Sequence, residues 1–235
     1  MLFIKSLLTF FLAIAIAMPA QAAEKWKITS LDWEPYSGKN LPDHGKSIVK
    51  LRQALQLSGI KLEVEFLPWA RAKTMATQPG YIGYFPAWPE EVEDDFVASP
   101  PVDWSKISIM ARRRICIPEN IDSLFARHIV GLVKTYEYPE EIAEAAKRYS
   151  DNVDQAPDEN SLVRKLARGR CEVAITDPSV MKYYAAQNGI ENIVVLKKLF
   201  TTPLVVAIRK SEYSDRVLEI LTKALARQEE ASSTK

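Results

Sequence analysis

The sequence is poor in the residues that metal sites and nucleotide-binding loops need. It holds two histidines, His44 and His128, and two cysteines in 235 residues. Neither histidine has a second ligand at a spacing that sets both on one face of an element. The eight glycines form no G-x-G-x-x-G or Walker pattern, and no G-x-S-x-G or H-E-x-x-H occurs. We therefore expect no metal ion, no cofactor and no familiar catalytic constellation.

The chain also lacks an excess of positive or of negative residues. The chain has 31 Lys+Arg against 30 Asp+Glu, a formal net charge of +1, and the basic residues are not gathered in a tail. A nucleic-acid partner is not expected, because nucleic-acid binding depends on a concentrated positive surface. The hydrophobic fraction of 47% and the charged fraction of 26% are typical of a globular protein with one or two domains.

The N-terminal segment has the pattern of a secretory signal. Met1 to Lys5 is a short positive start, Leu7 to Ala17 is apolar, and Ala20-Gln21-Ala22 is a small-x-small cleavage site. A membrane anchor is the alternative, but the apolar run stops at Pro19, short of the roughly 20 residues that a span needs. We predict that residues 1–22 are a cleaved signal peptide and that the mature chain is a soluble, monomeric, periplasmic protein.

Two series of alternating strands and helices follow. The first comprises strands at 27–31, 61–66 and 81–85, with helices at 46–57 and 68–77. The second comprises strands at 107–113, 129–133, 152–153, 172–176, 193–196 and 204–208, with helices at 140–149, 159–168, 178–187 and 214–227. This order predicts an α/β fold with parallel strands.

Two extended segments, near 99–113 and 200–206, connect the two series. They indicate two lobes with a cleft between them. We place the first lobe at 23–105 plus 205–235 and the second at 106–204. Ligands in such sheets bind outside the carboxyl ends of the strands, which face the cleft.

Aromatic residues stand where the strands of the first series end. Trp33 and Tyr36 follow the first strand, Trp69 and Arg71 follow the second, and Trp88 follows the third. Aromatic rings offer a small ligand a large contact area, and an arginine can hold a carboxylate through paired hydrogen bonds. Each ring could instead fill the core of its own lobe. Their position on three neighbouring loops favours the cleft.

The second series offers two further candidates. Thr135 and Tyr136 lie where a strand leads into a helix, and free backbone N–H groups at a helix start can bind an anionic group. Asp177 ends a strand and precedes Pro178. It is either the partner of a ligand ammonium or the N-cap of the following helix.

Together these segments look like the bacterial extracellular solute-binding protein family 3, the receptors of ABC importers for polar amino acids. The resemblance rests on Trp33-Glu-Pro-Tyr36-Ser-Gly38, on Leu67-Pro-Trp69-Ala-Arg71-Ala72, on Ser99-Pro-Pro101, and on Leu166-Ala-Arg-Gly169-Arg170-Cys-Glu-Val-Ala-Ile-Thr-Asp177. It implies a two-lobed, type II periplasmic-binding-protein fold that closes over a small polar ligand, an amino acid or a related carboxylate, by hinge motion. An ABC permease or a membrane receptor is the implied partner.

The resemblance also implies roles for individual residues. Asp177 matches the acid that receives the ligand's α-ammonium group. Thr135 and Tyr136 match the segment near the ligand carboxylate, and Trp33 and Tyr36 match the first-lobe aromatic loop. No catalytic residue is implied.

One departure from the family pattern affects the ligand. Amino acid receptors usually carry an arginine that clamps the α-carboxylate, and residues 80–91 contain none. Either Arg71 substitutes for it or the ligand is not an α-amino acid.

Two other functions stay open. Dehydratases of cyclic prephenate-like acids resemble this fold, and Glu34 and Glu91 are the candidate acid or base groups for such chemistry. A protein that presents its ligand to a membrane receptor, for sensing instead of import, is the second.

The fold leads to an expectation for the cysteines. In an oxidising compartment two cysteines can pair. The strand at 107–113 should run antiparallel to the strand at 172–176, so the end of one lies beside the start of the other. Cys116 and Cys171 occupy those ends, and we expect them to form a disulfide.

Overall fold

The structure is a computed structural model that describes residues 24–233. The predicted signal peptide, residues 1–22, lies outside the described residues. Within the described range, no helix combines the length and the apolar character needed to cross a membrane.

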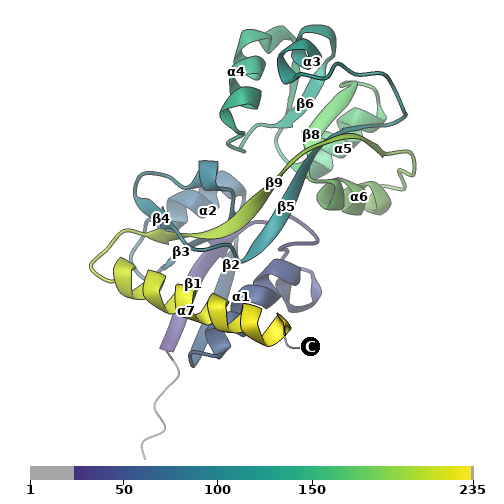
Figure 1. Ribbon diagram of the computed structural model, residues 1–235. Coiled ribbons are helices and arrows are strands. Elements are labelled where there is room, and N and C mark those ends of the chain that lie inside the picture. Colours follow the sequence, from purple (N-terminus) through teal and green to yellow (C-terminus); the bar gives the residue numbers. More distant parts are fainter. Residues whose placement is uncertain (1–23, 234–235) are drawn as a thin grey trace, which may run out of the picture.

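Strands and helices alternate along the chain (Figure 1). The strands are β1 (Glu24–Ser30), β2 (Ile60–Phe66), β3 (Gly83–Ala87), β4 (Phe96–Ala98), β5 (Asp103–Ala111), β6 (Val130–Val133), β7 (Val153–Ala156), β8 (Val173–Thr176) and β9 (Val194–Arg209). The α-helices are α1 (Lys46–Gln56), α2 (Trp69–Ala76), α3 (Ile121–Arg127), α4 (Glu140–Arg148), α5 (Glu159–Ala167), α6 (Pro178–Gln187) and α7 (Ser214–Ser233). Three 3-10 turns are η1 (Pro42–His44), η2 (Pro89–Glu91) and η3 (Ser150–Asn152).

The strands form two lobes joined through one continuous sheet. Their order is β2-β1-β3-β9-β5-β8-β6-β7, with β4 also paired to β9. In the first lobe β1 lies parallel to β2 and β3, and in the second β6 lies parallel to β7 and β8. Figure 1 shows α1, α2 and α7 around the first lobe and α3 to α6 around the second. The predicted parallel α/β series are thus both present.

The long strands β5 and β9 connect the lobes. They run antiparallel from the pair Asp103 and Leu204 to the pair Ala111 and Val194. The far end of β9 also pairs with β3 and β4 of the first lobe, whereas β5 also pairs with β8 of the second. Both strands therefore belong to both lobes, and the predicted lobe boundaries, after 105 and after 204, fall inside them.

Amphipathic helices complete the packing. In α1 the buried residues Ile48, Leu51 and Leu55 recur at helical spacing, so that one face enters the core of the first lobe. Helix α7 packs against α1 and β9, and its Val217 and Leu221 are buried. The C-terminal helix thus packs on the first lobe.

Some elements differ from the sequence-based expectation. The strands predicted at 193–196 and 204–208 are two ends of the single strand β9, because the polar residues and Pro203 between them stay in the ladder, with Pro203 opposite Trp104. Helix α3 was not predicted. It begins after Asn120, whose side chain accepts a hydrogen bond from Ser123 N at 2.7 Å, a normal N-cap.

The expected disulfide is wrong. Both cysteines are free, Cys116 exposed and Cys171 buried. The antiparallel pairing of β5 with β8 is as predicted, but its register, Ser108 opposite Thr176 and Met110 opposite Ala174, leads toward Arg113 opposite Cys171. Cys116 lies beyond that point. The Cys171 thiol instead packs inward, so close to Gly131 that an added Cβ there would lie 2.7 Å from Sγ.

Candidate functional site

Aromatic side chains from both lobes enclose a small cavity. Its walls are Leu31, Trp33, Trp69, Pro86, Trp88, Glu91 and Tyr136. Tyr136 comes from the second lobe, and its ring packs edge-to-face on Trp88 with centroids 5.3 Å apart. The space open to the centre of a water molecule is about 10 Å³, enough for roughly one water. The lobes thus meet through their rings, around a cavity that is nearly filled.

The ends of parallel strands bring these rings together. Trp33 follows β1, Trp69 opens α2 after β2, and Trp88 follows β3. Trp33 is fixed by a tight turn in which its N–H donates to the Ser37 carbonyl at 2.8 Å. Its ring stacks on Tyr36 at 4.6 Å and meets Trp88 at 6.3 Å. The sequence-predicted aromatic residues therefore do gather at one edge of the first lobe.

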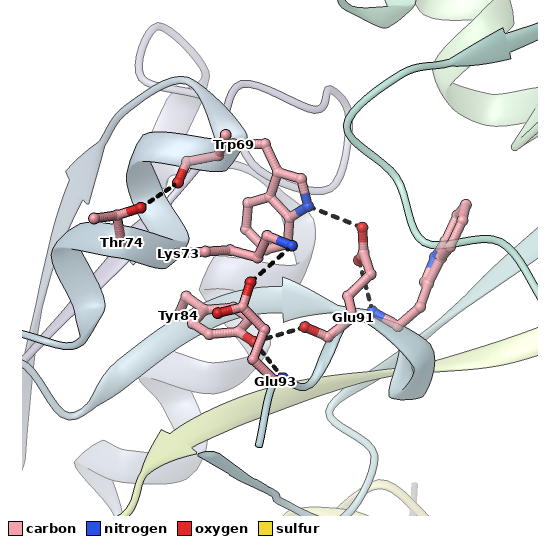
Figure 2. A network of polar contacts seen from close by, with 8 residues as sticks. Trp69, Lys73, Thr74, Tyr84, Glu91 and Glu93 are labelled. Carbon is pink, nitrogen blue, oxygen red and sulfur yellow. Dashed lines mark hydrogen bonds and ion pairs between the residues drawn. The ribbon is translucent and has the colours of Figure 1, made fainter. Parts of the chain in front are cut away.

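Glu91 is buried, and its carboxyl lies beside the indole nitrogen of Trp69 (Figure 2). Its Oε1 accepts a hydrogen bond from Trp69 Nε1 at 2.8 Å, and its Oε2 accepts one from the Trp88 backbone N–H at 3.0 Å. Burial raises the pKa of this carboxyl to about 7, although both hydrogen bonds and the charge of Lys73 act in the opposite direction. Lys73 itself is paired with Glu93 at 3.0 Å. The Glu91 carboxyl thus gains or loses its proton near neutral pH.

Glu159 is a second buried acid, on the opposite side of the interface. It is the first residue of α5 and is 3% exposed. Its Oε1 accepts a hydrogen bond from Thr176 Oγ1 at 2.6 Å. Burial, and then the charge of Asp177, raise its pKa to about 8, while the nearby side chains of Trp33 and Tyr136 lower it. Sequence reasoning treated this position only as the start of a helix.

Two polar atoms at this point lack a normal hydrogen bond. Trp33 Nε1 and Glu159 Oε2 are both buried and have no partner at the distance and angle of a normal hydrogen bond, but the side chains of Trp33 and Tyr136 act on the Glu159 carboxyl as hydrogen-bond donors and lower its pKa. A buried polar atom without a good partner costs about 1–3 kcal/mol. The hydrogen bonding of Glu159 is therefore less complete than a buried carboxyl usually has.

Asp177, in contrast, is completely engaged. Its Oδ1 caps α6 by accepting from Ser179 N at 2.6 Å. Its Oδ2 accepts from Tyr36 Oη at 2.7 Å, Ser105 Oγ at 2.8 Å and Lys106 N at 2.8 Å. The structure shows the N-cap, and the role of ligand partner stays a prediction. A ligand ammonium could reach this carboxylate only by displacing one of these donors.

Two other residues that the sequence suggested lie outside the cavity wall. Arg71 is exposed on α2 and Thr135 is half-buried in a turn, and neither lines the cavity. A contact that the sequence did not suggest lies nearby: the Tyr184 hydroxyl, on α6, donates to Glu34 Oε2 across the lobes. Arg71 does not line the cavity in this structure, and its role as a carboxylate clamp stays a prediction.

The charge at the cavity is acidic. Glu91 is the charged residue in its wall, with Glu159 behind Trp33 and Tyr136. Among residues 24–233 there is no group of three histidine, cysteine or carboxylate side chains arranged to hold a metal ion. The cavity wall offers a small molecule aromatic rings and one carboxyl group, that of Glu91.

The fold is the two-lobed fold of periplasmic binding proteins. A histidine kinase sensor domain with similarity to periplasmic binding proteins matches with a TM-score of 0.76 and 18% identity, over 90% of this chain and 93% of that one. An ancestral arginine-binding protein bound to arginine matches with a TM-score of 0.70 and 20% identity, over 88% and 92%. An ancestral amino acid-binding protein, a precursor of cyclohexadienyl dehydratase, matches at 0.67 and 18%, over 88% and 90%.

No protein-family profile matches the sequence, and no curated protein does so. The three structural matches described above are below 25% identity, so what they establish is the fold. The two-lobed fold implied by the family resemblance is thereby confirmed, and its solved neighbours include proteins that bind amino acids.

Proposed function

We propose that this protein is a periplasmic solute-binding protein that closes its two lobes over a small polar ligand, an amino acid or a related molecule, and delivers it to an ABC importer. One observation carries the proposal: the cavity has walls from both lobes, with Trp33, Trp69 and Trp88 on one side and Tyr136 on the other. A ligand held there contacts both lobes at once, so its binding energy favours the closed arrangement.

The connections between the lobes suit such a motion. Apart from the strands β5 and β9, the lobes are held by side-chain contacts such as the Tyr36 to Asp177 bond and the Tyr184 to Glu34 bond. These can break and re-form while the ladders within each lobe persist. Opening bends β5 and β9 and parts the rings of Trp88 and Tyr136.

Ligand binding to two tryptophan variants tests this. Wild-type protein is screened by thermal shift and calorimetry against amino acids, amines and organic acids, and small-angle scattering follows compaction. We expect a ligand of at least micromolar affinity, and Trp88→Ala should weaken it more than about tenfold by removing ring contact from the cavity. Trp104→Ala is the matched control, because Trp104 lies on β5 with 53% of its surface exposed. If no compound binds, or if both variants behave alike, the proposal fails.

An enzyme on the same scaffold is the second candidate. The observation in its favour is Glu91, a carboxyl in the cavity wall whose pKa is raised to about 7, a value suited to general acid or base work near neutral pH. One structural neighbour is a precursor of a dehydratase. Turnover of prephenate or arogenate by the wild type, lost in Glu91→Gln, would support this candidate.

Transport and sensing share the same ligand-binding step. The neighbour with the TM-score of 0.76 is a sensor domain. Adjacent genes for a permease and an ATPase would support import, and an adjacent gene for a membrane receptor would support sensing.

A further inference from the structure

The cavity combines aromatic faces with carboxyl groups. Three tryptophans and Tyr136 form most of its wall, and Trp33, Trp88 and Tyr136 meet at steep angles, with interplanar angles of 75° and 72°. Rings arranged in this way present both faces and edges to the space between them. The faces of tryptophan rings attract cations, and the attraction grows when water is removed from the site.

The two buried carboxyl groups lack a matching positive group. The charge of Lys73 acts on Glu91, but Lys73 Nζ is bound to Glu93. For Glu159, the charged neighbour that most affects it is Asp177, which is itself acidic. An anion placed in this cavity would add negative charge beside Glu91 and Glu159. A cation would supply the partner that both lack.

The unpaired atoms support the same conclusion. Glu159 Oε2 has no hydrogen-bond partner in a residue that is 3% exposed, and it lies beside Trp33 and Tyr136, which line the cavity. Structural buried carboxylates normally have each oxygen paired, as Asp177 does. The side chains of Trp33 and Tyr136 pair with the Glu159 carboxyl only imperfectly, so a charged donor that enters beside these rings would pair with it better.

The phenol of Tyr136 is within electrostatic range of both acids. Both Glu91 and Glu159 contribute to raising its pKa, so both carboxyl groups are near this one ring. Because Tyr136 also lines the cavity, a charged group that enters beside it comes within range of both. The site is thus acidic on its first-lobe side and on its second-lobe side.

We infer that the ligand of this site is a small organic cation, an amine or a quaternary ammonium compound, whose charged group lies against the tryptophan faces between Glu91 and Glu159. The inference rests on the proposed function, since the nearly filled cavity must open to admit such a ligand. It differs from the carboxylate expected from the family resemblance. The missing arginine clamp and the exposed position of Arg71 are consistent with it.

The preference for a positively charged ligand can be tested on the wild-type protein. Calorimetry compares choline and putrescine with 3,3-dimethylbutan-1-ol, the uncharged molecule of choline's shape, and with glutamate and succinate. We expect a cation to bind at least about tenfold more tightly than the uncharged alcohol. If glutamate or succinate binds and the cations do not, the cation inference is overturned while the solute-binding function stands. Equal binding of choline and the alcohol also overturns it. If no compound in the wider panel binds, the proposed function itself fails.

Two substitutions localise the charge effect. Glu91→Gln and Glu159→Gln should each weaken cation binding by about tenfold or more, because each removes a negative charge next to the ligand. Glu90→Gln is the matched control, since Glu90 precedes Glu91 in the same short turn and is exposed. A loss of the same size in Glu90→Gln contradicts the assignment, and so does unchanged affinity in both buried variants.

The pH dependence is an independent readout if Glu91→Gln does not fold. The groups that face the two acids are Lys73, Tyr84, Tyr136, Tyr138, Asp177 and Tyr184, with the backbone of Trp88 and Glu137. The four tyrosines have raised pKa values and stay neutral. The carboxyl pKa values are about 7 and about 8, so binding of a cation should release protons from these groups. Between about pH 6 and about pH 8, the affinity should therefore rise with pH. For each proton released, the rise should be up to about tenfold per pH unit. A flat profile contradicts the inference.

Discussion

The contact between the lobes holds two buried acids, one by the hinge and one by the cavity, and the two differ in their hydrogen bonds. At the hinge end, by β5, the carboxylate of Asp177 accepts hydrogen bonds on both oxygens, from Tyr36, Ser105, Lys106 and Ser179. At the cavity end, Glu159 has one oxygen unpaired. The hydrogen bonds of the first acid hold the lobes together, whereas under our proposal the second acid faces the ligand. The proposal thus assigns structural and ligand roles to different acids of one interface.

The largest expected effect is at the hinge end. Asp177→Ala leaves several buried donors without an acceptor, and we expect the free energy of unfolding to fall by about 4 kcal/mol. Urea denaturation measures this change. Asp158→Ala is the matched control, because Asp158 is an exposed N-cap aspartate that accepts from Ser161 N at 2.6 Å and should cost only about 1 kcal/mol. Equal losses in the two variants would show that Asp177 is an ordinary cap and would remove the contrast between the two ends.

At the cavity end we expect a substitution to raise the free energy of unfolding instead of lowering it. The pKa of Glu159 is raised from 4.5 to about 8, so its contribution to stability is fully present below about pH 4.5 and is lost as the pH rises toward 8. Over this range the folded state holds a proton that the unfolded state has released, and one such group lowers the free energy of unfolding by about 1.4 kcal/mol per pH unit. Glu159→Gln should therefore be more stable than the wild type by about 3 kcal/mol near pH 7, and similar to it near pH 5.

Urea unfolding at several pH values between about 5 and about 8 checks this. Glu144→Gln, on the exposed face of α4, should keep the wild-type pH dependence. If Glu159→Gln is less stable than the wild type near pH 7, then Glu159 is a charged structural group like Asp177, and the two ends do not differ.

Sequence reasoning located the rings but not the second acid. Trp33, Trp69 and Trp88 could be predicted because each follows a strand, and parallel strands end at the same edge. Glu159 opens a helix in a polar segment, where an acidic residue is normally solvent-exposed. Its burial depends on packing against the other lobe, which local sequence does not encode.

The elements of the fold also divide into those that the sequence predicts and those that it does not. Helix α1 and strand β2 could be predicted because their apolar residues repeat with the period of a helix and of a strand. The continuity of β9 could not, because Pro203 and its polar neighbours resemble a turn, and what keeps them extended is pairing with β5, far away in sequence. The disulfide failed for the same reason: strand direction could be inferred, but the register that separates Cys116 from Cys171 could not.

The smallest expected effect concerns the hydrogen bond from the Tyr184 hydroxyl to Glu34, which joins the two lobes. Tyr184→Phe removes the donor to Glu34 Oε2 and keeps the ring, so we expect closure to weaken by about 1 kcal/mol. Small-angle scattering should then show a more open unliganded protein, with little change in the urea midpoint. Tyr183→Phe is the matched control, because Tyr183 is next to it on α6 and its ring meets Tyr184 at 5.5 Å. If Tyr184→Phe destabilises folding as much as Asp177→Ala, the cavity end is as structural as the hinge end, and reserving it for a ligand loses its physical basis.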